Sequence, residues 1–150
     1  MNPAGPWRGL VLAGGHSRRM GRDKALIEIG GVPLWRRQAS VLRAAGAEEV
    51  WLSLRAGQEP YPGASAWLRD ARAEAGPLAG LLAGLSGLPG GWLLVLPVDM
   101  PQVGASWFAR LRAACRPGTG AVFRSAGGFE PLAAIYPAGA RAEAERRLAR

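Results

Sequence analysis

Residues 92–101 read Trp-Leu-Leu-Val-Leu-Pro-Val-Asp-Met-Pro, and the first five form the longest apolar run of the chain. A continuous apolar run without alternation is typical of a strand that is buried on both faces, as in a parallel sheet. The run is much shorter than the ~20 apolar residues that a membrane-spanning helix needs. It therefore predicts a central strand over 92–96 that ends at Pro97 and carries Asp99 just past its carboxyl end.

Strands and helices alternate along the rest of the chain, and Gly46 is the expected C-cap of the first long helix. Alternation over short loops is typical of a doubly wound α/β fold. We therefore expect a three-layer, Rossmann-like domain over 1–150, with a mostly parallel sheet and ligands at the carboxyl ends of its strands. The expected strands are 10–13, 50–54, 66–68, 92–96, 120–123 and 132–136, and the expected helices are 35–45, 76–85, 107–115 and 138–150.

The composition excludes several classes of protein. The chain has 150 residues, of which 49% are hydrophobic, so it can bury a substantial core and is not a disordered protein. Its one cysteine, Cys115, excludes an internal disulfide framework and a multi-cysteine zinc site. Its one histidine, His16, excludes a paired-histidine metal centre. We expect Cys115 to be a core residue and His16 to be a loop residue rather than a catalytic group.

Lysine and aspartate are scarce, and the few that occur fall in candidate site segments. Lys24 is the single lysine among 19 basic residues, and the aspartates are Asp23, Asp70 and Asp99. Base composition of the genome explains why these residue types are scarce, but it does not explain why the few that occur lie in these segments.

The formal net charge of +8 raises the question of a nucleic-acid or membrane partner. The arginines are spread over expected helix faces without interleaved aromatic residues, so we expect neither partner, and solvated helix faces explain the charge. Residues 1–9 contain no apolar segment of the kind that a signal peptide needs, and we expect a cytoplasmic protein.

Residues 12–24 read LAGGHSRRMGRDK and run from the end of the expected strand 10–13 into the loop that follows it. Glycines here allow backbone N–H groups to approach a phosphate, and Arg18 and Lys24 can neutralise its charge. The spacing matches neither a Walker A loop nor a dinucleotide fingerprint. The alternative is an ordinary loop with solvated arginines.

Two further segments have a chemical and a structural interpretation each. Asp99 suits a Mg²⁺ ion that is also bound by phosphate oxygens, but an aspartate there could equally cap a helix or form a turn. Asp70 could accept two hydrogen bonds from the edge of a guanine base, with the glycines of 76–80 against its face. The alternative there is a tight loop before a helix.

Together these segments resemble the molybdenum cofactor guanylyltransferase family, a branch of the nucleotide-diphospho-sugar transferase fold. The resemblance rests on 12–24, Asp70, 76–80 and 97–101, in that order, and covers most of the chain. It implies transfer of GMP from GTP to molybdopterin-bound molybdenum, with release of pyrophosphate and with Mg²⁺ as cofactor. Proteins that deliver or receive the molybdenum cofactor are further candidate partners, and the oligomeric state is left open.

The resemblance also implies a role for individual residues. Arg18, Lys24 and Asp99 would act on the phosphates, and Asp99 would bind the metal. The nucleotide would be lined by Leu12, Ala13, Gly14, Gly15, Lys24, Ser53, Asp70, Gly76, Pro77, Gly80 and Asp99.

Two departures from the family pattern stand out. Ser53 takes the place of an asparagine that often contacts the nucleotide, and its hydroxyl can make one such hydrogen bond. Family members usually continue into a segment with an Asn-x-Asn-Thr-Pro motif near the metal, whereas the printed sequence ends at Arg150. Either the printed sequence is short of that segment, or the acceptor side of the site is incomplete.

Two alternatives to this function remain at the level of sequence. One is a related cytidylyl- or sugar-nucleotidyltransferase, and the other is a truncated homologue that binds nucleotide without turnover. In the guanylyl reaction the attacking phosphate is already anionic near neutral pH, so the expected mechanism is positioning and charge neutralisation rather than general base catalysis.

Overall fold

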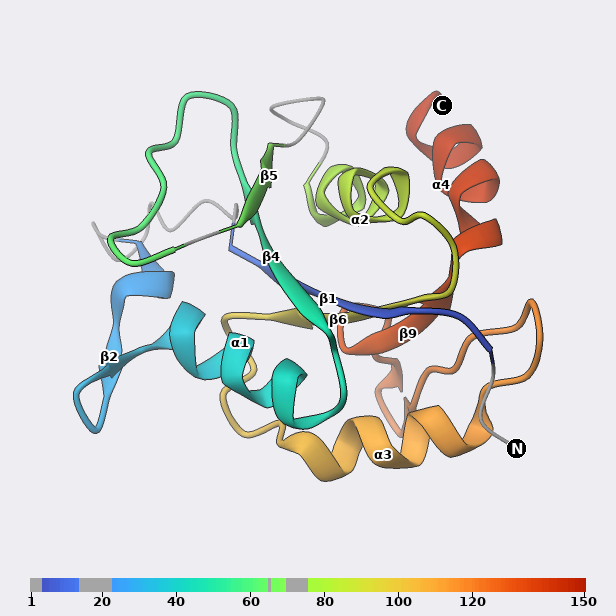
Figure 1. Ribbon diagram of the computed structural model, residues 1–150, viewed down its shortest axis with the longest axis horizontal. Coiled ribbons are helices and arrows are strands. Elements are labelled where there is room, and N and C mark those ends of the chain that lie inside the picture. Colours follow the sequence, from blue (N-terminus) through green and yellow to red (C-terminus); the bar gives the residue numbers. More distant parts are fainter. Residues whose placement is uncertain (1–3, 14–22, 65, 70–75) are drawn as a thin grey trace.

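A five-stranded sheet forms the centre of the computed structural model, which describes residues 4–13, 23–64, 66–69 and 76–150 (Figure 1). The strand order is β5-β4-β1-β6-β9, and every neighbouring pair is parallel except β6 and β9, which are antiparallel. The mostly parallel sheet is thus confirmed. The strands are β1 (Trp7–Leu12), β4 (Glu49–Leu54), β5 (Trp67–Arg69), β6 (Trp92–Pro97) and β9 (Ala134–Pro137).

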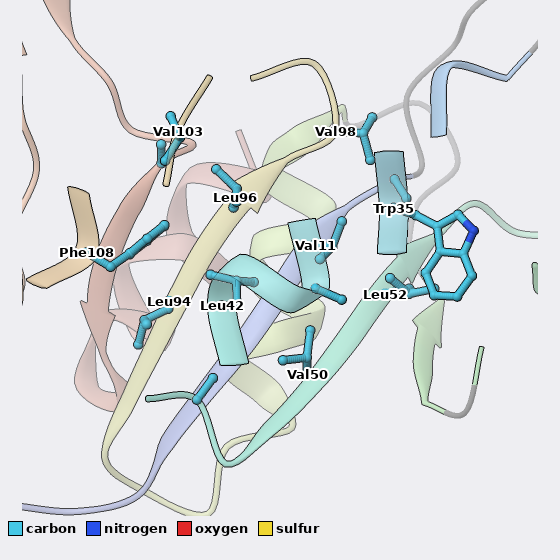
Figure 2. Packing of buried hydrophobic residues seen from close by; sticks show 14 of the residues in the cluster. Val11, Trp35, Leu42, Val50, Leu52, Leu94, Leu96, Val98, Val103 and Phe108 are labelled. Atoms are coloured by element: carbon cyan, nitrogen blue, oxygen red, sulfur yellow. The ribbon is translucent and has the colours of Figure 1, made fainter. Parts of the chain in front are cut away.

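Helices cover both faces of the sheet, which gives the expected three layers. In Figure 1, α1 (Leu34–Ala44) and α3 (Ala105–Ala114) lie on one side, and α2 (Pro77–Ser86) and α4 (Arg141–Leu148) lie on the other. Each side has its own hydrophobic core. Figure 2 shows the larger core, where Leu42 of α1 lies over side chains from β1, β4 and β6.

The central strand β6 explains why two cores form. All six of its residues are buried. Leu94 and Leu96 belong to the core under α1 and α3, whereas Leu93 and Val95 belong to the core under α2 and α4. Successive side chains of a strand point to opposite faces, so a continuous apolar run supplies both cores. Burying each leucine contributes about 1.5–3 kcal/mol.

Helix α1 ends as the sequence predicts. Gly46 has a φ of +107°, which favours glycine because it lacks a Cβ. The Gly46 N–H donates to the Arg43 carbonyl and the Ala47 N–H donates to the Leu42 carbonyl, both at 3.0 Å. These two bonds form a Schellman motif, which satisfies carbonyls that a helix end leaves without partners.

The predicted strand over 120–123 is wrong. Only Ala121 pairs with Ile135 there, as an isolated bridge. The chain then turns away from the sheet, and the Glu130 N–H donates to the Phe123 carbonyl at 3.0 Å to close a separate hairpin of β7 (Arg124–Ser125) and β8 (Gly128–Phe129). The ring of Phe123 packs on Trp107, with ring centroids 4.3 Å apart, so its burial comes from a helix rather than from a strand ladder.

A second short hairpin lies between residues 23 and 34. After the 3-10 helix η2 (Lys24–Leu26), β2 (Glu28–Ile29) and β3 (Val32–Pro33) pair across Gly30 and Gly31, which both have positive φ, as a tight hairpin turn requires. A further 3-10 helix, η3 (Ala138–Ala140), leads into α4. Within the described part of the chain, no helix is long and apolar enough to cross a bilayer.

Candidate functional site

The carboxyl ends of β1, β4 and β6 lie side by side, which brings three predicted site segments together. The Ala13 N–H donates to the Ser53 carbonyl, and the Val98 N–H donates to the Leu12 carbonyl, both at 3.3 Å. Leu12 and Ala13 are themselves buried, so their side chains support the strand ends from within the cores. Loops beyond these strand ends occupy the position where doubly wound sheets bind their ligands.

Asp99 lies in the turn that follows β6, and its side chain is exposed. It does not cap the next helix, because the N-cap of α3 is Gly104. Of the two structural alternatives for Asp99, a helix cap is therefore excluded, whereas a turn is observed. No three His, Cys, Asp or Glu side chains of the described residues cluster as a ready-made metal cage. A single exposed carboxylate fits Mg²⁺, which keeps several waters and takes its other ligands from substrate phosphates.

The turn that carries Asp99 is held from beneath by helix α1. The Gln38 amide donates to the Pro97 carbonyl at 2.8 Å and to the Met100 carbonyl at 3.0 Å, and Gln38 is fully buried. Arg37 adds a bond from its guanidinium to the Pro101 carbonyl at 3.2 Å. Two hydrogen bonds from one buried side chain therefore hold the backbone on both sides of Asp99.

Sequence reasoning missed Gln38, although a signal for it exists. The buried positions of α1 are Leu34, Trp35, Gln38, Ala39 and Leu42, which is a helical stripe of apolar residues with one amide in it. A buried amide N–H needs hydrogen-bond acceptors, and the backbone of a packed loop supplies them for the Gln38 Nε2 atom. A glutamine at an apolar position of the helix therefore indicates a loop held against that helix.

Lys24 opens the 3-10 helix η2, and Asp23 is the residue that caps it. The Asp23 Oδ1 atom accepts a hydrogen bond from the Ala25 N–H at 2.9 Å. The other carboxylate oxygen, Oδ2, accepts a bond from the Tyr61 hydroxyl at 2.6 Å. The segment that ends in Asp23 and Lys24 is thus held at its carboxyl end. The predicted residues Gly14, Gly15, Arg18 and Asp70 lie outside the described residues, as does His16.

The two predicted glycines of 76–80 serve different structural purposes. Gly76 is the N-cap of α2 with a φ of +64°, and Pro77 follows at the first helical position, which suits a residue without an N–H. Gly80 is instead required by space, because a Cβ there would lie 2.5 Å from the Ser53 Oγ and 2.9 Å from Leu12. Helix α2 therefore approaches the ends of β1 and β4 very closely.

Ser53 is almost fully buried beneath this contact. Its hydroxyl lies against the backbone of α2, so the close packing of Gly80 already explains a small residue at this position. Contact of Ser53, Gly76, Pro77 and Gly80 with a nucleotide stays a prediction. Cys115 is buried as expected, and burial raises the pKa of its thiol. Trp67, by contrast, is 41% exposed on the edge strand β5.

Comparison with known proteins decides the family. The model of the MobA-like NTP transferase domain matches residues 9–150. The chain belongs to the MobA-like NTP transferase family. It is 54% identical over 145 residues to the probable molybdenum cofactor guanylyltransferase of Opitutus terrae, and the alignment covers 95% of this chain and 72% of that relative. The resemblance to the molybdenum cofactor guanylyltransferase family, first seen in the motifs, is thereby confirmed over most of the chain.

Solved structures show the same fold as this NTP transferase domain. Molybdopterin-guanine dinucleotide biosynthesis protein A from Archaeoglobus fulgidus matches with a TM-score of 0.68 at 23% identity, over 95% of this chain and 73% of that one. Rv0371c from Mycobacterium tuberculosis, solved as a complex with manganese, matches with a TM-score of 0.64 at 22% identity, over 95% and 76%. At this identity the likeness concerns the fold, and it confirms the Rossmann-like NTP transferase architecture.

Proposed function

We propose that this chain transfers GMP from GTP to the molybdenum cofactor and releases pyrophosphate, to form a guanine dinucleotide cofactor. The observation that carries the proposal is the 54% identity to a relative named as a probable molybdenum cofactor guanylyltransferase. The site geometry supports it, since Leu12 ends β1 and Asp99 follows its parallel neighbour β6. The Tyr61 hydroxyl lies near both the Ala13 carbonyl after β1 and the carboxylate of Asp23, which directly precedes Lys24. We further propose that the reaction takes place in the cytoplasm.

Each predicted residue has a part in this proposal. The backbone of 12–15 and the loop before α2 would line the nucleotide, and Asp70 would accept hydrogen bonds from the guanine edge. Arg18 and Lys24 would offset the charge that develops on the leaving pyrophosphate. Asp99 would hold Mg²⁺, whose chemistry when bound is to neutralise phosphate charge and orient the phosphate oxygens.

The reaction needs no strong general base. A terminal phosphate oxygen of the molybdopterin, already anionic near neutral pH, would attack the α-phosphorus of GTP in line. One oxygen–phosphorus bond forms as the bond to pyrophosphate breaks, and the leaving group departs with its charge. The protein's contribution is to position the two anionic substrates and to neutralise their charge. The Gln38 bonds on either side of Asp99 suit such a role, because they hold the carboxylate's backbone before substrate binds.

A pyrophosphate-release assay with GTP, Mg²⁺ and the molybdenum cofactor tests this function directly. Asp99→Ala should lower the rate by about 10²–10³, the usual cost of losing an electrostatic contact to the transition state. Glu145→Ala is the matched control, because it removes an exposed carboxylate to which no role is assigned. A rate for Asp99→Ala near that of the wild type would refute the metal assignment.

A panel of nucleoside triphosphates, followed by thermal shift, tests the choice of base. GTP should raise the melting temperature more than CTP, UTP or ATP, because binding to the folded state alone stabilises it. A larger shift with CTP or UTP would indicate a cytidylyl- or sugar-nucleotidyltransferase instead. Binding of GTP without release of pyrophosphate would indicate a nucleotide-binding homologue without turnover.

A further inference from the structure

The loop between β4 and β5 carries Tyr61, which joins two parts of the chain that are distant in sequence. Its hydroxyl lies 2.6 Å from Asp23 Oδ2 and 3.3 Å from the carbonyl oxygen of Ala13. Ala13 directly follows β1 and Asp23 directly precedes Lys24, so the two described residues that flank 14–22 meet at one hydroxyl. A hydroxyl has one proton, and the short distance to a carboxylate indicates that Asp23 receives it.

Tyr61 is itself held in place by its surroundings. It is 5% exposed, and its ring stacks on Trp35 of α1 with centroids 5.9 Å apart and an interplanar angle of 13°. Burial and the neighbouring Asp23 carboxylate raise the pKa of its hydroxyl, so that it stays a proton donor throughout the physiological range. A buried, stacked phenol of this kind presents its hydroxyl in one orientation.

Gln58 extends the contact and fastens the loop. Its amide donates to the Tyr61 hydroxyl at 2.8 Å and to Asp23 Oδ2 at 3.3 Å, while its Oε1 accepts from the Arg55 N–H at 2.9 Å. The guanidinium of Arg69, at the end of β5, donates to the Gln58 carbonyl at 2.6 Å. The loop is thus tied to the strand that directly precedes Asp70, as well as to the residue that directly precedes Lys24.

We propose that Tyr61 is a positioning residue, which holds the Lys24 ammonium in place for the phosphates of GTP through its hydrogen bond to Asp23. The proposal rests on the phosphate role assigned to Lys24 under the proposed function. Asp23 accepts a hydrogen bond from the start of η2 at one oxygen, and at the other oxygen it accepts a short bond from Tyr61 and a longer one from Gln58. Loss of the Tyr61 hydroxyl therefore removes the shortest of the three bonds that restrain the residue next to Lys24. The placement also explains why an aspartate stands before the single lysine of the chain.

Tyr61→Phe is the decisive variant, because it removes the hydroxyl and keeps the ring that stacks on Trp35. We expect kcat/KM for GTP to fall about tenfold, since small misplacements of a reacting group are costly. The affinity for GTP should weaken in direct titrations, while the affinity for guanosine, which has no phosphate, should stay the same. Asp23→Asn should act in the same direction, because one accepting oxygen becomes an amide.

A double-mutant cycle tests whether the effect passes through Lys24. In a Lys24→Ala background, Tyr61→Phe should cost less than about twofold further, since effects that share one path are not additive. The matched control is Tyr136→Phe, which removes a hydroxyl that donates to the Pro131 carbonyl at 2.5 Å, on a strand that no assigned role involves. This control should leave kcat/KM unchanged.

The outcomes separate this inference from the proposed function. A wild-type chain that binds GTP but releases no pyrophosphate overturns the proposed transfer reaction, and the comparison of GTP with guanosine then still tests Tyr61. Wild-type activity with an unaltered kcat/KM in Tyr61→Phe overturns the positioning role. An additive tenfold loss in the Lys24→Ala background also overturns it, because Tyr61 then acts by another route.

Discussion

The central sheet has an amino edge, where its parallel strands begin, and a carboxyl edge, where they end. The two are built from different interactions. At the amino edge, the rings of Trp7 and Trp92 stack with centroids 5.4 Å apart, and the guanidinium of Arg112 lies 4.1 Å from the ring of Trp7. Both tryptophans are buried. The Gly91 backbone packs so closely that a Cβ there would lie 2.1 Å from the Pro6 carbonyl oxygen. Aromatic stacking, a cation–π contact and close backbone packing together close this edge.

At the carboxyl edge, buried polar side chains hold the loops. Gln38 bonds to the backbone around Asp99, and Tyr61 bonds to Asp23 beside Lys24. Apolar packing gains energy from area and has little direction, whereas hydrogen bonds fix the orientation of the groups that they join. Changes at the amino edge should therefore alter stability, and changes at the carboxyl edge should alter activity.

The largest effect is expected for Trp7→Ala, at the amino edge. Truncation of a buried tryptophan should lower the free energy of unfolding by about 3–5 kcal/mol, since it leaves a cavity next to Trp92. Urea denaturation measures the loss, and KM for GTP in the remaining folded protein should not change. A loss below about 1 kcal/mol would mean that the stacked pair does not close this edge.

Lys24→Ala should show the opposite pattern at the carboxyl edge. Loss of a charge that offsets the leaving pyrophosphate should lower kcat by about 10²–10³, equivalent to about 2.7–4 kcal/mol. The melting temperature should stay within the error of the measurement, because Lys24 is only partly buried. Lys24→Arg keeps the charge but changes the donor geometry, so it should retain part of the activity. If Lys24→Ala and Trp7→Ala lowered the free energy of unfolding equally, the two edges would not differ in what stabilises them.

Gly80→Ala tests a residue that lies at the carboxyl edge but is explained by packing. The added methyl group would lie 2.5 Å from the Ser53 Oγ, and relief of that contact should cost about 1–3 kcal/mol of unfolding free energy. Ser53→Ala in the same chain removes the closest atom and should restore part of the loss in thermal denaturation. If Gly80→Ala made the free energy of GTP binding less favourable by more than it lowered the free energy of unfolding, Gly80 would belong to the nucleotide site instead.

The smallest effect is expected for the ion pair between Arg8 and Glu48 at the amino edge. The two side chains approach to 2.9 Å, but that of Glu48 is 60% exposed. A double-mutant cycle in thermal or urea unfolding should give a coupling energy of about 0.2–1 kcal/mol, which falls as salt is added. A larger coupling would show that electrostatics, and not only packing, stabilises the amino edge.

The outline of the fold could be predicted because each of its signals is local. The apolar run of 92–96 indicates a strand with two buried faces, and Gly46 indicates the end of a helix, because both patterns follow from backbone geometry within a few residues. The strand expected at 120–123 failed for the opposite reason. Its residues are apolar enough for a sheet, but Phe123 packs against Trp107 of α3 instead. A local sequence pattern does not indicate such a distant partner.

The same division holds for the candidate site. The family, the doubly wound sheet and the place of Asp99 directly after a strand could be predicted from the sequence, since motifs and apolar runs consist of neighbouring residues. What holds Asp99 and Lys24 in place could be seen only in the folded protein. Gln38 lies 59 residues from the Pro97 carbonyl that it binds, and Tyr61 lies 38 residues from Asp23. Such partners are chosen by how helices and loops pack on the sheet, because a buried polar group bonds to whatever the fold brings within reach.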